Sequence, residues 1–276
     1  MDCFLQWKLV LSCCAGYRPS AEQNLTPGRA TGGCCMSVIA VVNRKGGSGK
    51  STLSTHIAAY LASLGEEVML GDIDRLQSSR LWLSLRDPRY KKIHGWSIDE
   101  KNFARPPAGV KHVVLDTPGG FQGFGLMKVT MYADAILLPA AAGIFDRNSA
   151  AESIRELRAF PRVASGRCKI ACVGMRIDGR TRQAEALQAW ASEQALDCIG
   201  TIRMAQAYSK CLEAGLSIFD FPPNKVETYL PEWQPITAWL DAILAAAAPT
   251  PGSHGSREEL RTRQPILASR PVLPQL

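Results

Sequence analysis

Long apolar runs and metal-binding motifs are both missing from the 276-residue sequence. No segment reaches the roughly 18 consecutive apolar residues that a membrane-spanning helix needs. There is also no CxxC pair and no cluster of histidines, so we expect no metal held by cysteine or histidine. Five of the nine cysteines precede the first convincing element, and we interpret the other four, Cys168, Cys172, Cys198 and Cys211, as buried free thiols in a reducing cytosol.

A strong excess of charge is absent as well. The net charge is +7, of which residues 1–35 contribute +1 and residues 248–276 contribute +2, so +4 remains for the middle of the chain. Such a mild excess is compatible with a polyanionic partner and equally with a solvated surface. With 46% hydrophobic residues the chain can bury one sizeable core, and two domains would be a tight fit.

The two ends of the chain lack the periodicity of helices and strands. Residues 1–35 mix Gly, Pro, Ser and Thr, and we interpret them as disordered or as a mis-annotated extension, with Met36 as the true initiator. The first fourteen residues weakly resemble a secretory leader, with one lysine, Lys8, before a short apolar run. Residues 248–276 contain five prolines and are expected to form a disordered tail.

Between the ends, short apolar runs alternate with helical patterns. Strands are expected at 37–42, 67–70, 111–115, 133–138, 168–174 and 198–202, and helices at about 50–64 and 232–247. In the first of these helices, Leu53, Ile57, Leu61 and Leu64 recur every three or four positions. The alternation predicts one α/β domain over residues 36–247, with a mostly parallel central sheet and helices on both faces.

A glycine-rich loop joins the first predicted strand to the first predicted helix. It reads Lys45-Gly46-Gly47-Ser48-Gly49-Lys50-Ser51-Thr52. Backbone N–H groups in such a loop converge on a phosphate at the helix N-terminus. Lys50 would contact the β- and γ-phosphates, and the Ser51 hydroxyl would ligate Mg²⁺. The fold is therefore predicted to be a single P-loop NTPase domain that binds ATP and Mg²⁺.

Three aspartates follow two of the predicted strands. Asp72 and Asp74 come after the strand at 67–70, and Asp116 comes directly after the strand at 111–115. Ligands of open α/β sheets bind at this carboxyl edge. Phosphoryl transfer needs an anion near the metal and another group to orient the attacking water. We assign Asp72 to the neighbourhood of Ser51 and Mg²⁺, and Asp74 to the water, although each aspartate alone would more often be a turn cap.

This constellation resembles the ParA/MinD family of partition and positioning ATPases, whose phosphate loop reads K-G-G-x-G-K-[ST]. The resemblance implies that Lys45 is a signature lysine that reaches the ATP of the partner subunit, in a homodimer formed on ATP binding. The catalytic set is then Lys45, Lys50 and Asp74, and Asp116 would bind Mg²⁺ through water. Two positions depart from the expected motifs: Arg44 stands where the ordinary Walker A motif has its first glycine, and Arg75 replaces the proline of the family's D-x-D-P-Q.

The resemblance extends over about residues 36–247 and includes the segments DGRTRQAEAL and IRMAQAYSK. In that family, basic residues at the equivalents of these segments bind DNA without sequence preference. The candidate DNA contacts are Arg180, Arg182, Arg203 and Lys210, which could also be ordinary solvated side chains. Arg176, after the strand at 168–174, is the candidate for contact with adenine.

The leading hypothesis is an ATPase for plasmid or chromosome partition that binds DNA as the ATP dimer. A centromere-binding or adaptor protein would stimulate hydrolysis and release it. We expect it in the cytoplasm on the nucleoid, without stable membrane association, because prolines 265, 271 and 274 disfavour a membrane-binding helix. The alternatives are a positioning ATPase for a non-DNA cargo on the nucleoid and a MinD-like membrane-cycling regulator. An iron–sulfur scaffold is disfavoured by the placement of the cysteines, and a small-molecule enzyme because the sequence indicates no substrate pocket.

Overall fold

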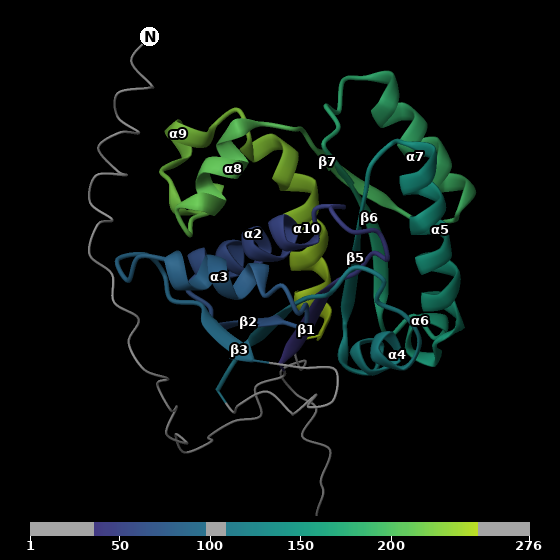
Figure 1. Ribbon diagram of the computed structural model, residues 1–276, viewed down its shortest axis with the longest axis horizontal. Helices are drawn as coiled ribbons and strands as arrows, with labels where there is room; N and C mark the ends of the chain where they lie inside the picture. Colours follow the sequence, from purple (N-terminus) through teal and green to yellow (C-terminus); the bar gives the residue numbers. More distant parts are fainter. Residues whose placement is uncertain (1–35, 98–108, 248–276) are drawn as a thin grey trace, which may run out of the picture.

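A seven-stranded sheet lies at the centre of the part of the protein that the structure describes (Figure 1). The computed structural model describes residues 36–97 and 109–247, and the extensions predicted over 1–35 and 248–276 lie outside these ranges. The strands are β1 (Ser37–Val41), β2 (Val68–Asp72), β3 (His94–Ser97), β4 (His112–Asp116), β5 (Ala135–Ala140), β6 (Lys169–Met175) and β7 (Cys198–Ile202). Their spatial order is β3-β2-β4-β1-β5-β6-β7, and every strand pairing among the described residues is parallel.

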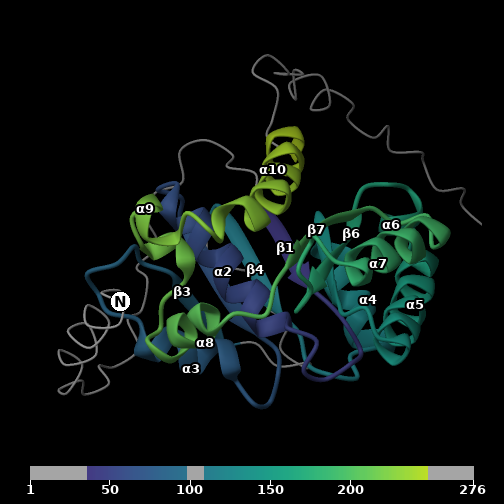
Figure 2. The ribbon, with the colours of Figure 1, turned by 90° about the horizontal axis from the view of Figure 1, so that it is seen from above.

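Helices cover both faces of this sheet (Figure 2). One face packs against α2 (Lys50–Ser63), α3 (Ser78–Leu85), α8 (Gln206–Glu213), the 3₁₀ turn η1 (Ile218–Asp220), α9 (Pro223–Val226) and α10 (Leu230–Ala247). The other face packs against α4 (Gly123–Tyr132), α5 (Ile144–Ala159), α6 (Pro161–Ala164) and α7 (Arg182–Glu193). The structure is therefore a three-layer α/β domain, as predicted.

The central strand β1 shows why the sequence forms this sandwich. Val38 and Ala40 face the layer of α4, α5 and α7, whereas Ile39 and Val41 face the layer of α2 and α10. All four side chains are buried. A strand buried on both faces has a continuous apolar sequence, which is typical of parallel sheets covered by helices on both sides. The two apolar cores are thus built on a single sheet.

The predicted fold class is confirmed, and the differences lie in boundaries and in one strand. The six predicted strands are present, with ends displaced by up to two residues. The short edge strand β3 was not predicted, so Asp116 ends the fourth strand along the chain and not the third. Helix α10 begins at Leu230 rather than at residue 232, because Pro231 is tolerated in a first turn. Within the described ranges, no helix combines the length and apolar character required to cross a bilayer.

Candidate nucleotide-binding site

The phosphate loop follows β1 and enters α2 through glycines that no other residue could replace without strain. Gly47 and Gly49 have φ angles of 69° and 99°, in the left-handed region that side chains rarely adopt. A Cβ at Gly49 would also lie 2.8 Å from Cε of Met175, the last residue of β6. The loop is therefore packed directly against the end of β6, at the carboxyl edge of the sheet.

Lys50 and Ser48 turn inward from this loop. The Lys50 side chain is buried, its Nζ donates to the Lys45 carbonyl at 3.0 Å, and burial lowers its pKa against the opposing effect of Asp116 and Asp74. The Ser48 hydroxyl is buried without a hydrogen-bond partner among the described residues. A buried polar atom of this kind normally has a partner, and a phosphate oxygen would supply one.

Arg44 and Lys45 turn outward and are held by α5. Arg44 forms ion pairs with Glu152 and Glu156, and Lys45 Nζ lies 2.8 Å from Oδ2 of Asp146 in the first turn of α5. Lys45 is not among the residues that line the pocket of its own subunit. The two lysines of the loop therefore have opposite orientations, because one faces the phosphate position and the other faces a neighbouring helix.

Asp116 lies at the bottom of the site, with no exposed surface. Its Oδ2 accepts from the Ser79 hydroxyl at 2.6 Å and its Oδ1 faces the Ser54 hydroxyl at 3.4 Å. Burial raises the pKa of Asp116 to about 6, while hydrogen bonds from Ser79 and Ser51 oppose that shift. The contact with Ser51 brings together two of the three residues that the sequence predicted for Mg²⁺, the third being Asp72.

Asp72 is paired with Asp116 in register across β2 and β4, so it also lies behind the phosphate loop. Both of its oxygens are engaged by the backbone: Oδ1 accepts from the Asp74 amide, and Oδ2 accepts from the amides of Ser79 and Arg80 at the start of α3. Burial raises its pKa against these hydrogen bonds. Asp72 therefore holds the turn that carries Asp74, and its predicted place near Mg²⁺ remains a prediction.

The turn after Asp74 forms without the proline that the related motif carries. Asp74 Oδ1 accepts from the Leu76 amide at 3.0 Å, and the Gln77 amide side chain donates to the carbonyls of Asp72 and Asp74. These hydrogen bonds hold an Asx-type turn that needs no proline. No hydrogen bond to Asp74 Oδ2 is found among the described residues, so one carboxylate oxygen is available to a water.

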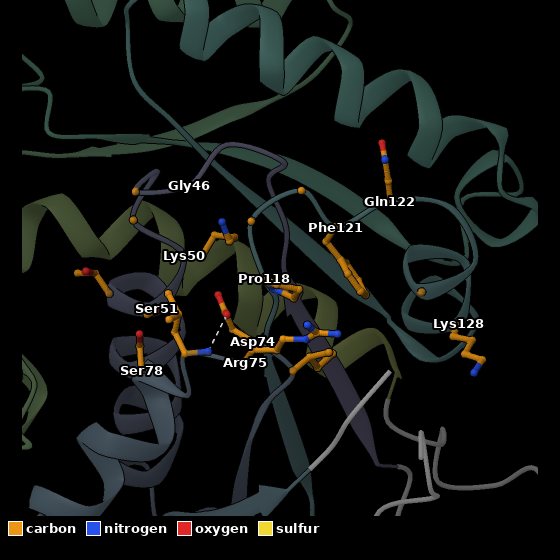
Figure 3. Close-up of a pocket in the computed structure, with 18 of the residues that line it drawn as sticks. Gly46, Lys50, Ser51, Asp74, Arg75, Ser78, Pro118, Phe121, Gln122 and Lys128 are labelled. Atoms are coloured by element: carbon orange, nitrogen blue, oxygen red, sulfur yellow. Dashed lines mark hydrogen bonds between the residues drawn. The ribbon is translucent and has the colours of Figure 1, made fainter. Parts of the chain in front are cut away.

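A pocket of about 1310 Å³ opens above the phosphate loop (Figure 3). Of the predicted site residues, it is lined by Gly46, Gly47, Gly49, Lys50, Ser51, Thr52 and Asp74. Figure 3 shows Lys50, Ser51 and Asp74 on one side of the pocket and Lys128 on the other. This pocket is continuous with the phosphate loop.

The loop after β4 forms the roof of this pocket and touches the phosphate loop. The Thr117 hydroxyl donates to the Val41 carbonyl at 2.7 Å, and the Gly120 amide donates to the Arg44 carbonyl at 2.6 Å. A Cβ at Gly119 would lie 3.4 Å from Cα of Gly46. The two loops are in van der Waals contact, so a displacement of the phosphate loop would reach the loop after β4 directly.

The four predicted DNA contacts differ in exposure and in their partners within the protein. Arg203, after β7, bonds to Glu232 and to the Thr228 carbonyl and lies over the ring of Tyr229. Arg180 is 84% exposed and forms an ion pair with Asp178 at 2.8 Å.

Arg182 is exposed at the start of α7, and Lys210 lies in the last turn of α8. Arg176 is exposed and has a φ angle of 61°, directly after the Met175 that touches the phosphate loop. Arg176 therefore lies close to the nucleotide pocket without lining it, and Arg203 is committed to contacts within its own subunit.

Several residues of the site were not predicted from the sequence. Asp146 and Glu156 bind the outward-facing Arg44 and Lys45, Ser79 binds Asp116, and Asn43 donates to the Pro139 carbonyl at 2.7 Å while accepting from the Lys45 amide. A signal for Asp146 did exist, because it lies in the first turn of the helix that follows the predicted strand at 133–138. Its partner is 101 positions away and could not be read from local sequence.

The residues present fit a magnesium ion that is shared with a nucleotide. Among the described residues, no group of three or more His, Cys, Asp or Glu side chains could hold a metal by itself. Mg²⁺ in nucleotide sites usually takes one or two carboxylates, water and phosphate oxygens. Ser51 and Asp116, in contact beneath the phosphate loop, supply the protein's part of such a set.

Strand β1, the phosphate loop and helix α2, with aspartates at the ends of the adjacent strands β2 and β4, define a P-loop nucleotide-binding domain with a second lysine in its loop. The model of the CobQ/CobB/MinD/ParA nucleotide binding domain matches residues 39–218, and the chain belongs to that family. Within it, the chain is a ParA/MinD-type protein.

Similar proteins include the maintenance of carboxysome distribution protein A of Gloeobacter kilaueensis, 26% identical over 210 residues that cover 74% of this chain and 94% of that protein. The chromosome-partitioning ATPase Soj of Thermus thermophilus is 45% identical over 82 residues, which cover 29% of this chain and 32% of Soj. The solved structure of a Cyanothece McdA–ATP complex has the same fold, with a TM-score of 0.57 at 16% identity over 76% of this chain and 97% of the other.

Proposed function

We propose that this protein is a Mg²⁺-dependent ATPase that forms a homodimer on binding ATP and then binds DNA without sequence preference, as in plasmid or chromosome partition. The observation that carries the proposal is the outward orientation of Lys45. Lys50 already provides a cation for the phosphates of its own subunit, whereas Lys45 points out of that pocket toward Asp146. A second lysine so placed can contact the phosphates of the nucleotide in a partner subunit once its ion pair with Asp146 breaks.

The other residues have separable roles in hydrolysis. The N–H groups of the loop and Lys50 hold the phosphates, and the free Oδ2 of Asp74 orients the attacking water. Ser51 and Asp116 hold Mg²⁺, which would neutralise charge on the phosphates when bound. The loop after β4 contacts the phosphate loop through Gly119, so loss of the γ-phosphate can loosen the dimer.

DNA binding by the dimer would use the exposed arginines near the carboxyl edge of β6. Arg180 and Arg182 are exposed, and a dimer presents two copies of each. Arg203 is a weaker candidate, because contact with DNA would require it to leave Glu232 and the Thr228 carbonyl. An adaptor or centromere-binding protein would then stimulate hydrolysis and release the dimer from the nucleoid.

The test measures dimerisation and duplex DNA binding with ATP, ADP and no nucleotide, over a range of salt concentrations. We expect ATP-dependent dimers in the wild type, none in Lys45→Ala, and loss of nucleotide binding itself in Lys50→Ala. Arg182→Glu should reduce the salt dependence of DNA binding by about one phosphate contact per subunit. The matched control is Arg167→Glu, the same charge change on an exposed arginine before β6, at the opposite edge of the sheet.

The outcomes separate the parts of the proposal. ATP-dependent dimers that bind no DNA at any salt concentration would overturn the partition function and retain the nucleotide-gated dimer. Anionic vesicles in the same assay test the membrane-cycling alternative, and we expect no ATP-dependent binding to them. DNA binding that is equal with ATP and ADP would contradict gating by the γ-phosphate.

A second candidate, positioning of a large protein cargo along the nucleoid, is favoured by one observation. The similarity to the carboxysome distribution protein spans 94% of that protein, whereas the similarity to Soj spans 32% of Soj. The two candidates share the ATP cycle and differ in cargo. Imaging a fluorescent fusion beside a labelled replicon distinguishes them, since loss of this gene should cause replicon loss only in the partition function.

A further inference from the structure

Two cysteines face one another across the edge of the sheet, away from the residues assigned to nucleotide binding. Cys172 of β6 is the register partner of Cys198 of β7. Both side chains lie on the same face, because Cys172 belongs to the core beneath α5 and α7 and Cys198 packs against that core. Neighbouring strands are about 4.8 Å apart, within the range of Cα separations that a disulfide bridges. The two sulfur atoms already share a hydrogen bond.

A β-bulge lies directly at this pair. Cys172 pairs with Cys198, but the next residue, Val173, pairs with Gly200, so Ile199 is an extra residue on β7. A bulge interrupts the ladder and leaves backbone groups without strand partners. The Cys198 thiol donates to the Gly200 carbonyl, with Sγ and O 3.9 Å apart, and the Gly174 backbone also contacts its sulfur. The irregular strand thus surrounds one sulfur atom with polar backbone.

The two thiols are not equivalent. The Cys172 thiol donates to the Cys198 sulfur, which lowers the pKa of Cys198 against the opposing effect of burial. The same hydrogen bond, together with burial, raises the pKa of Cys172. Cys198 is half-buried, whereas Cys172 has no exposed surface. Cys198 is therefore the more accessible of the two thiols, and the hydrogen bond from Cys172 favours its thiolate.

Cys168 and Cys211 show what the ordinary buried cysteines of this protein look like. Each is 2% exposed, and burial raises the pKa of each to about 12. No other described cysteine contributes to the pKa of either thiol. Cys168 and Cys211 fit the expectation of inert buried thiols, and the pair at the bulge departs from it.

We propose that Cys172 and Cys198 form a peroxide-sensitive dithiol that closes into an intrachain disulfide between β6 and β7. The Cys198 thiolate attacks a peroxide oxygen, so that an S–O bond forms, the O–O bond breaks and hydroxide leaves with a proton as water. Cys172 then attacks the Cys198 sulfur, so that the S–S bond forms, the S–O bond breaks and the departing hydroxide leaves with the Cys172 proton as a second water. Two thiols are oxidised by two electrons and one hydrogen peroxide is reduced to two waters.

The test treats the reduced full-length protein with a small excess of hydrogen peroxide, alkylates the remaining thiols and maps tryptic peptides by mass spectrometry. Trypsin separates Cys172, in peptide 170–176, from Cys198, in peptide 183–203, and from Cys211, in peptide 211–225. We expect a disulfide-linked pair of the first two peptides that dithiothreitol abolishes, while Cys211 remains fully alkylated. Without peroxide, Cys198 should be alkylated at least about tenfold faster than Cys211.

Two isosteric variants test the order of the steps. In Cys172→Ser, Cys198 should accumulate as a sulfenic acid that a 1,3-dione probe labels, and in Cys198→Ser, Cys172 should remain a thiol at the same peroxide dose. The alkylation of Cys211 reports whether the protein stays folded. Oxidation of Cys198 no faster than Cys211, or disulfides that join either thiol to the cysteines of residues 1–35 instead, would overturn the proposal.

Discussion

His56, in the middle of α2, should make the stability of this protein fall in mild acid. The ring has no exposed surface and stacks on Trp233, with centroids 5.0 Å apart, while Tyr208 meets it edge-on at 5.5 Å. Its Nδ1 lies 2.8 Å from the Thr52 carbonyl, so Nδ1 carries the proton of the neutral ring. Nε2 is buried without a partner among the described residues, and a second proton there would be a buried, unpaired donor.

The magnitude follows from the difference in pKa between the folded and unfolded states. Burial lowers the pKa of His56 from 6.5 to about 4, against weaker effects of the Thr52 carbonyl and of Asp220. Between these two pH values the unfolded chain binds a proton that the folded protein excludes, so stability falls as the pH falls. Each pH unit in that window costs about 1.4 kcal/mol, which amounts to about 3 kcal/mol by pH 4. Above pH 6.5 the ring is neutral in both states, so this loss of stability is absent.

The assay is urea denaturation of the wild type and of His56→Gln at half-unit steps from pH 7 to pH 4. Gln keeps an N–H for the Thr52 carbonyl and does not titrate, so the difference at pH 7 reports altered packing alone. Asp116, whose raised pKa acts in the opposite direction over part of this range, is present in both proteins and cancels in the comparison. From pH 7 to pH 4, the free energy of unfolding of the wild type should fall by about 3 kcal/mol more than that of His56→Gln. Parallel curves would refute the reasoning.

Three further perturbations test other contacts. Asp146→Asn removes the ion pair of Lys45, so dimerisation should require several-fold less ATP in sedimentation experiments; an unchanged requirement would contradict the role given to that pair. Arg86→Ala should lower the free energy of unfolding in urea by about 3–5 kcal/mol, because Asp220 would lose its ion-pair partner. The two side chains are each 5% exposed, so the carboxylate would remain buried. A loss below about 1 kcal/mol would argue against an unpaired buried charge. Arg75→Pro should keep stability and ATP turnover near wild type, within about 1 kcal/mol for stability, because other bonds hold the turn; lost turnover would assign Arg75 a part in catalysis.

The sequence predicted the fold well where apolar runs are long and bounded by motifs. The four-residue strand β3 was missed because HGWS has no apolar alternation and follows two lysines and one isoleucine. Edge strands of this length are determined by the neighbouring strand, here β2, more than by their own sequence.

The candidate site was predictable in its glycines, Lys50 and aspartates, since spacing alone brings them to one edge of the sheet. Which oxygen of each aspartate is free was not predictable, because that depends on backbone amides of a turn such as the one that occupies Asp72. The pairing of Arg203 with Glu232 was likewise hidden, because the two residues meet only when α10 packs beside β7.

Glu156 has a consequence for how this sequence can change over time. Its carboxylate accepts from the Arg44 guanidinium and from the Gly123 amide, so it joins the phosphate loop, the start of α4 and its own helix α5. Arg44 occupies the position where the ordinary loop motif has a glycine, and this side chain is useful only while an acidic residue faces it. The two positions are therefore expected to covary among relatives, with glycine at 44 accompanied by a neutral residue at 156. A substitution at one position alone should be rare, because it would remove the main ionic partner of the remaining side chain beside the phosphate loop.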